Sequence, residues 1–211
     1  MTRSSRQARL SPPSRRLLAF GASFALAAAG CARTSEPPAP GTSRGTPPDL
    51  RGSRVMVFPV QENRGVGGDP DAELAFGLQE RGEGVTWIFP EEMEDALTRS
   101  PGLDVSLHAM PVGMFTGSEV ERVGDPLYGE LRRMGALADA TVALIPLRAL
   151  AETSPDGTVA VQLWATLIHV RTGRVLWFGV VEGERTAPDD PRGLASAMDK
   201  LARTLLWYAA R

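Results

Sequence analysis

Two long runs in the last third of the sequence predict a β-hairpin, and this pair constrains the fold more than any other stretch. Residues 159–170 read VAVQLWATLIHV and residues 175–181 read VLWFGVV, with a short RTGR turn between them. Both runs are rich in β-branched and aromatic side chains, as strands are. One face of the first run carries Val159, Val161, Leu163, Ala165 and Leu167, and the other carries Gln162, Trp164, Thr166 and Ile168. The first face is predicted to be core, whereas the second is either covered by helices or left as a sticky surface.

The rest of the chain supplies further strands and helices around this hairpin. Short apolar runs predict strands at residues 54–60, 85–89, 103–108 and 140–147. Helical spacing and capping residues predict helices at residues 72–79 and 90–99, after Asp125-Pro126 and after Asp190-Pro191. Pro146 cannot donate to a ladder, so a bulge is expected there. The predicted fold class is α/β (α+β): a single domain with a mixed sheet of about five strands, helices packed on the sheet, and a C-terminal helix.

The N-terminal stretch has the character of an export signal. Residues 17–31 read LLAFGASFALAAAGC and follow a start with five arginines and no acid. The apolar run is shorter than the ~20 residues that span a bilayer, and it ends in small residues before the chain's only cysteine. This stretch resembles the lipobox of bacterial lipoproteins. The resemblance implies signal cleavage after Gly30, lipidation of Cys31 (palmitate and related acyl chains), and membrane attachment through that residue.

Three segments are therefore expected: a signal peptide at residues 1–30, the lipidated cysteine with a disordered Pro/Ser/Gly-rich tether at 31–53, and a globular periplasmic domain at 54–211. About twenty tether residues at ~3 Å each would reach about 60 Å. Ala32, rather than an aspartate, follows the cysteine; by resemblance to the sorting signals of enterobacterial lipoproteins, this implies the outer membrane, facing the periplasm, over the inner one. Attachment to the inner membrane remains an alternative. The sequence is compatible with both the general secretory route and the twin-arginine export route.

Charge and composition exclude some functions. Residues 1–30 hold five of the 23 Lys and Arg residues and none of the 25 Asp and Glu residues, so the mature chain would have a net charge of about −7. This balance argues against a face that binds nucleic acid or anionic lipid. His108 and His169 are isolated, and no cofactor, metal site or catalytic residue is predicted.

An irregular apolar stretch at residues 109–124 is the first candidate for a binding surface. Flexible methionines suit adaptable contacts, although packing onto the fold is the competing interpretation. The residues proposed for a partner-binding surface are Trp87, Met110, Met114, Phe115 and Trp164. Two alternatives remain: a small-ligand or anion site in the glycine-rich loop 65–69, and a self-assembling subunit that associates through Trp164 and Ile168 on the hairpin.

The order of elements, with GALADA leading into the strand TVALIPL and RTGRVLW at the hairpin, resembles the small α/β domain of bacterial envelope lipoproteins and Tol components. This group contains the lipoprotein activator of a peptidoglycan synthase, the curli secretion lipoprotein, and the N-terminal domain of the Tol propeller protein. The resemblance implies a non-enzymatic envelope lipoprotein that binds and modulates or scaffolds another envelope protein, in cell-wall synthesis or secretion. It specifies neither the partner nor the oligomeric state.

Overall fold

The computed structural model describes residues 38–116 and 120–210, which belong to one compact unit, Ser35–Arg211. The signal peptide and Cys31 lie outside the described residues. The strands are β1 (Ser43–Arg44), β2 (Arg54–Val57), β3 (Asn63–Arg64), β4 (Thr86–Ile88), β5 (Val142–Thr153), β6 (Val159–His169) and β7 (Arg174–Glu182). The helices are α1 (Pro70–Arg81), α2 (Pro90–Thr98), α3 (Leu127–Ala138) and α4 (Pro191–Leu205), with 3₁₀ turns η1 (Gly113–Thr116) and η2 (Trp207–Ala210).

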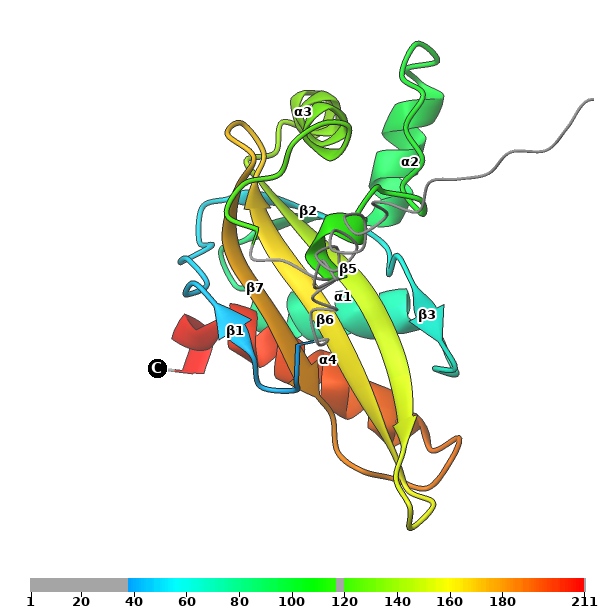
Figure 1. Cartoon of the computed structure of the whole chain (residues 1–211). Coiled ribbons are helices and arrows are strands. Elements are labelled where there is room, and N and C mark those ends of the chain that lie inside the picture. The colour runs from blue at the N-terminus through cyan, green and yellow to red at the C-terminus, as the bar shows by residue number, and fades with distance from the viewer. Residues whose placement is uncertain (1–37, 117–119, 211) are drawn as a thin grey trace, which may run out of the picture. The chain divides into compact units, whose positions relative to one another are not determined.

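The strands form one mixed seven-stranded sheet in the order β1-β7-β6-β5-β2-β4, with β3 paired to β5 (Figure 1). The predicted hairpin is confirmed: β6 and β7 pair antiparallel around the 170–173 turn, and β5 pairs antiparallel with β6. β2 runs parallel to both β4 and β5. The register shifts between Pro146 and Arg148, as the proline predicted. The predicted α/β fold with a C-terminal helix is therefore confirmed.

Both faces of the sheet are covered. Helices α1 and α4 pack on the face that carries Leu163 and Leu167, and the apolar stripe of α4 provides Leu194, Met198 and Leu201. Helices α2 and α3, together with the stretch between them, pack on the other face (Figure 1). Trp164 is 3% exposed and Ile168 is fully buried. The expectation that these two side chains form a free surface for self-assembly is therefore wrong, because the chain covers them itself.

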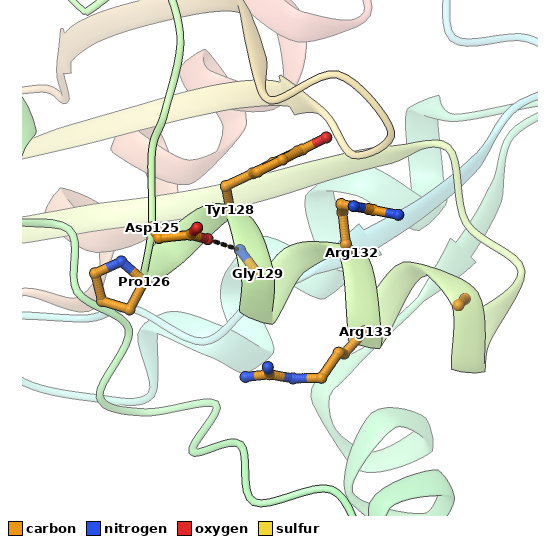
Figure 2. A pocket seen from close by; sticks show the side chains of 7 residues that line it. Asp125, Pro126, Tyr128, Gly129, Arg132 and Arg133 are labelled. Atoms are coloured by element: carbon orange, nitrogen blue, oxygen red, sulfur yellow. Dashed lines mark hydrogen bonds between the residues drawn. The ribbon is translucent and has the colours of Figure 1, made fainter.

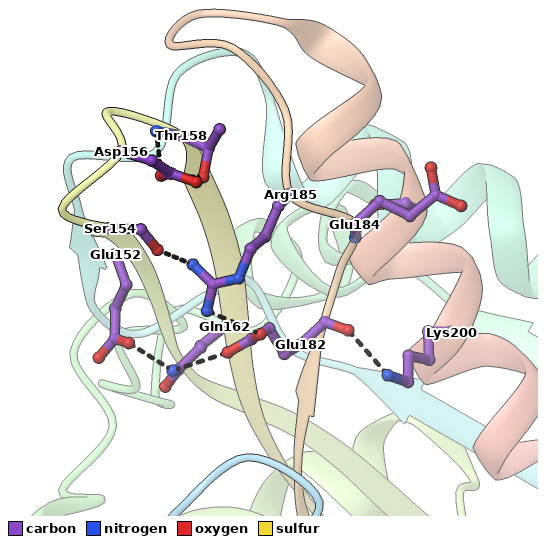
Figure 3. Close-up of polar contacts among 10 residues, drawn as sticks. Glu152, Ser154, Asp156, Thr158, Gln162, Glu182, Glu184, Arg185 and Lys200 are labelled. Carbon is purple, nitrogen blue, oxygen red and sulfur yellow. Dashed lines mark hydrogen bonds and ion pairs between the residues drawn. The ribbon is translucent and has the colours of Figure 1, made fainter.

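The sheet face covered by α2 and α3 becomes polar at the end near the β5–β6 turn. Gln162 on β6 is 4% exposed, and its Nε2 donates to Glu152 Oε2 on β5 (2.7 Å) and to Glu182 Oε2 on β7 (3.2 Å) (Figure 3). Arg185 bonds to Ser154 and lies 3.3 Å from Glu182. This network satisfies the buried amide and ties three neighbouring strands together.

Residues 103–108 do not form the predicted strand. Their side chains do alternate, with Leu107 buried and Asp104, Ser106 and His108 exposed. However, the backbone here belongs to no ladder; the Leu107 carbonyl instead accepts from Gln61 Nε2 at 2.8 Å. Alternation indicated which side chains are buried but could not supply a neighbouring strand.

The structure also differs from the expected tether over residues 38–53. β1 pairs antiparallel with the outer edge of β7, where Gly41 N donates to Val180 O and Val180 N donates to Thr42 O, both at 2.9 Å. Leu50 is 1% exposed, and Trp207 Nε1 donates to Pro47 O at 3.0 Å. We call residues 41–50 the edge segment. It belongs to the folded domain because it pairs the edge of β7 that would otherwise be open.

Candidate functional site

A recess of about 130 Å³ lies between the stretch 108–115 and the β5–β6 pair. We call it the loop pocket. Its apolar walls include Met110, Val112, Phe115, Leu147 and the ring of Trp164. Its polar lining comes from Gln61 and Glu62 after β2, from Arg148 of β5, and from His108 at the start of the stretch. The pocket thus joins three parts of the chain that are far apart in the sequence.

One side chain holds the apolar stretch in place. Gln61 Nε2 donates to Pro59 O (2.7 Å) and to Leu107 O (2.8 Å), and its Oε1 accepts from Met110 N (2.8 Å). Further along, the ring of Phe115 stacks on Phe178 of β7 with centroids 6.2 Å apart. The stretch is therefore attached to the sheet at both ends by specific contacts rather than by general apolar packing.

Arg148 forms the charged wall of the loop pocket. It lies directly opposite Trp164 in the β5–β6 register, and its guanidinium carbon is 4.9 Å from the Trp164 ring centroid. Its Nε donates to Glu62 Oε2 at 2.5 Å. Burial raises the pKa of Glu62, but hydrogen bonds from Arg148 and Arg64 outweigh burial and hold that pKa below its ordinary value. Glu62 is therefore ionised at neutral pH and fixes the Arg148 guanidinium against the indole.

The indole N–H of Trp164 is a second polar feature. Within the described chain, this Nε1 is buried and has no hydrogen-bond partner. A buried donor without an acceptor costs about 1–3 kcal/mol, so such groups are rare in folded proteins. Trp87 Nε1 is also buried without a hydrogen-bond partner in the described chain, but it lies against Gly82 outside this pocket.

The structure brings together three of the five residues proposed for a partner-binding surface. Met110, Phe115 and Trp164 line the loop pocket. Met114 packs against the apolar cluster that contains these three residues, but it does not line the pocket. Trp87 belongs to the core on the α1–α4 face and so is separate. Sequence analysis missed Gln61, Glu62 and Arg148. The signal available for Arg148 was a charged residue two positions after Pro146, where the bulge was predicted. Whether these residues bind a partner stays a prediction.

The glycine-rich loop lines a different recess, of about 330 Å³. Four carboxylates line it and no basic side chain does: Asp69, Glu73, Asp189 and Asp190. Asp69 also caps α1 by accepting from Asp71 N and Ala72 N, both at 3.1 Å, so the helix donors are already used. An anion would meet like charge here, and the geometry does not favour the anion-site alternative.

A third recess, open and about 740 Å³, runs along α3 (Figure 2). Arg132 and Arg133 line it, and the Arg132 guanidinium carbon lies 5.6 Å from the Tyr128 ring centroid. Asp125 Oδ1 accepts from Gly129 N at 3.0 Å and so satisfies a backbone N–H in the first turn of the helix. The groove is wide and shallow, with no buried polar group turned into it in the described chain.

The histidines contribute to no cluster. His108 Nε2 lies 3.4 Å from Glu94, and His169 Nδ1 lies 3.1 Å from Thr172 Oγ1. Over residues 38–116 and 120–210, no group of three His, Cys, Asp or Glu side chains is placed to hold a metal ion. In the same ranges no helix combines the length and apolar character needed to cross a bilayer.

Neither protein-family models nor curated proteins match this sequence. Among solved structures, a PelC dodecamer from Paraburkholderia phytofirmans is 19% identical, with a TM-score of 0.43 over 80% of this chain and 98% of that one. The LpoB C-terminal domain from Salmonella enterica is 16% identical (TM-score 0.40; 65% of this chain, 86% of that one). Lipoprotein GNA1162 from Neisseria meningitidis is 18% identical (TM-score 0.41; 65% and 84%). These neighbours include the lipoprotein domains that the sequence resembles. With every TM-score below 0.5, they say nothing of what this chain binds.

Proposed function

We propose that this chain is a bacterial lipoprotein, cleaved after Gly30 and lipidated at Cys31, whose domain docks onto another envelope protein and modulates or scaffolds it. The observation that carries the anchor is the sole cysteine placed directly after small residues and a short apolar run. The proposed location is the outer membrane, with the domain facing the periplasm. The domain acts by binding rather than by catalysis, and the loop pocket is the proposed contact.

The fold limits how far the domain stands from the lipid. Gly41 is already hydrogen-bonded to Val180, so Cys31 is ten residue steps from the sheet edge. At ~3.3–3.6 Å per residue, the fully extended length is about 35 Å, little more than half of the reach expected for a tether that ended at Ser53. The proposed partner is therefore one that presents its contact surface close to the membrane.

Two measurements test the proposal. Cells grown with labelled palmitate should label the wild-type protein and leave Cys31→Ser unlabelled; labelling of both would remove the anchor from the proposal. For docking, a photo-crosslinking residue is placed at His108, at the rim of the loop pocket, or at Phe76 on α1. The two side chains are similarly exposed, 63% and 62%.

Crosslinking in cells is expected to give one defined envelope protein from position 108 and none from position 76. The same product from both positions would mean that the loop pocket is not the contact. Recovery of only a second copy of the chain from position 108 would replace the docking function with self-association.

A further inference from the structure

We infer that the loop pocket binds the C-terminal end of a polypeptide whose last residue is aliphatic, with the side chain in the pocket and the terminal carboxylate on Arg148. This inference rests on the proposed docking function and deepens it, because it states which part of a partner is recognised.

The first step concerns the polar groups that the pocket leaves unused. Arg148 donates to Glu62 through Nε, and over the described residues its two Nη atoms donate to no protein acceptor. Trp164 Nε1 is likewise without an acceptor. Gln61, by contrast, uses both ends of its amide. The Arg148 guanidinium lies over the face of the Trp164 ring, 4.9 Å from its centroid, so the unused groups on the pocket wall are the Nη donors of Arg148. A matching ligand presents acceptors, and a carboxylate pairs best with a guanidinium.

The second step concerns charge. The Arg148 side chain is only 17% exposed, and Glu62, its partner, is shared with Arg64. One carboxylate therefore faces two guanidinium groups, which leaves an excess positive charge beside the pocket. A ligand carboxylate would neutralise it, and the partly buried position makes that pairing stronger than a surface ion pair.

The third step concerns size and walls. Met110, Phe115, Leu147 and the Trp164 ring surround a volume of about 130 Å³, enough for one aliphatic side chain and too small for a longer peptide. A ligand that fits must carry its carboxylate next to its apolar group and extend away on the other side. The last residue of a polypeptide has this arrangement, whereas an internal Asp or Glu lacks the apolar group.

The test uses the protein purified in mild detergent and the indole N–H signals of its tryptophans in ¹H–¹⁵N NMR spectra, with Trp164→Phe to assign the signal. The probes are acetyl-Gly-Gly-Leu as the free acid, the same peptide as its C-terminal amide, and acetyl-Gly-Gly-Gly as the acid. The leucine acid should shift the Trp164 signal in a saturable way. The amide, which lacks the charge, and the glycine acid, which lacks the side chain, should each bind about tenfold more weakly or worse.

Matched variants separate the pocket arginine from its neighbour. Arg148→Gln should weaken binding of the leucine acid by about tenfold or more. Arg64→Gln removes the other partner of Glu62 but not a pocket wall; it should weaken binding through the lost positive charge, by clearly less than Arg148→Gln does. Signals of Trp87, Trp177 and Trp207 report whether each variant is folded. If Arg148→Gln is unfolded, the comparison of acid with amide in the wild type still decides the matter.

The inference is overturned if the leucine acid gives no saturable shift, if acid and amide bind alike, or if Arg148→Gln binds as the wild type does. A crosslinked partner at position 108 combined with any of these results would leave the docking function standing and remove only the recognition of a chain end.

Discussion

Glu62 is held between two arginines from different segments, Arg64 of β3 and Arg148 of β5. Its pKa is below the ordinary value despite burial, so the folded state favours the ionised carboxylate. The stability that follows is fully present above the unfolded pKa of about 4.3 and is lost as pH falls through the lower, folded pKa. The ion pairs also orient the guanidinium that lines the loop pocket, which links this residue to the proposed site.

We therefore expect Glu62→Gln to lower the free energy of unfolding at pH 7 by about 0.5–1 kcal/mol, a value kept small because the side chain is 35% exposed. The difference from the wild type should shrink as the pH falls from neutral through the unfolded pKa and then through the lower, folded pKa, where the native carboxylate takes up its proton. Urea unfolding at both ends of this range measures it, with Glu83→Gln on an exposed loop as the control. An unchanged difference at low pH would show that the ion pairs add no stability.

At the scale of elements, α3 approaches the sheet through a glycine. A Cβ at Gly135 would lie 2.3 Å from Val170 Cγ1 and 3.2 Å from the Ala140 carbonyl oxygen. A Cβ at Gly129, on the same helix, would meet the end of the Asp125 side chain at 3.0 Å and that of Arg133 at 3.9 Å, and no backbone. The two positions thus share a helix but differ in what surrounds them.

Gly135→Ala should destabilise the domain by about 1–3 kcal/mol through overpacking, although alanine is the better helix former. Gly129→Ala should change the stability by no more than about 1 kcal/mol, because the better helix propensity of alanine is offset where Asp125 Oδ1, which accepts from Gly129 N, has to shift. Thermal unfolding of both variants measures the contrast. Equal effects of either sign would mean that close packing of α3 on Val170 does not matter.

The edge segment is a second element whose attachment depends on a glycine. Gly45 has φ +73°, and a Cβ there would lie 2.5 Å from the Leu176 carbonyl oxygen on β7. Replacement by alanine should detach residues 41–50 from β7, since both the backbone angle and the close contact oppose a side chain. Hydrogen exchange at the Val180 amide, which donates to Thr42 O, should become faster. Gly67→Ala, with nothing within 4 Å, is the control and should leave that amide unchanged.

Elements were predictable from the sequence where the pattern is local. The first hairpin run and α4 show periods of two and 3.6, and β7 is a continuous apolar run after a short turn, so the existence of these elements could be derived. The edge segment could not, because Leu50 is its one large apolar side chain and its partner, β7, lies more than 130 residues away. The loop pocket was predictable only in part: Met110, Phe115 and Trp164 stood out as apolar, whereas Arg148 gained its place from the register between β5 and β6.

At the scale of the whole molecule, the domain and its proposed anchor are joined by a short connection. The edge segment, which begins at Gly41, pairs with the outer edge of β7 (Figure 1). The ten residue steps from Cys31 to Gly41 limit the distance between the lipid and this edge to about 35 Å. Energy transfer from the sheet edge to the membrane should therefore be efficient.

A single dye can report this distance, because the chain's only cysteine is proposed to be acylated and a new cysteine would be unique. Ser43→Cys, on exposed β1, is labelled and the protein is placed in vesicles that contain acceptor-labelled lipid. Twenty Gly/Ser residues inserted between residues 37 and 38 should lower the transfer, since a flexible insert of that length adds a root-mean-square distance of about 25 Å. The same insert in the exposed 155–157 turn adds length elsewhere and should leave the transfer unchanged. Equal transfer with and without the insert at residue 37 would mean that contacts other than the anchor hold the domain at the membrane.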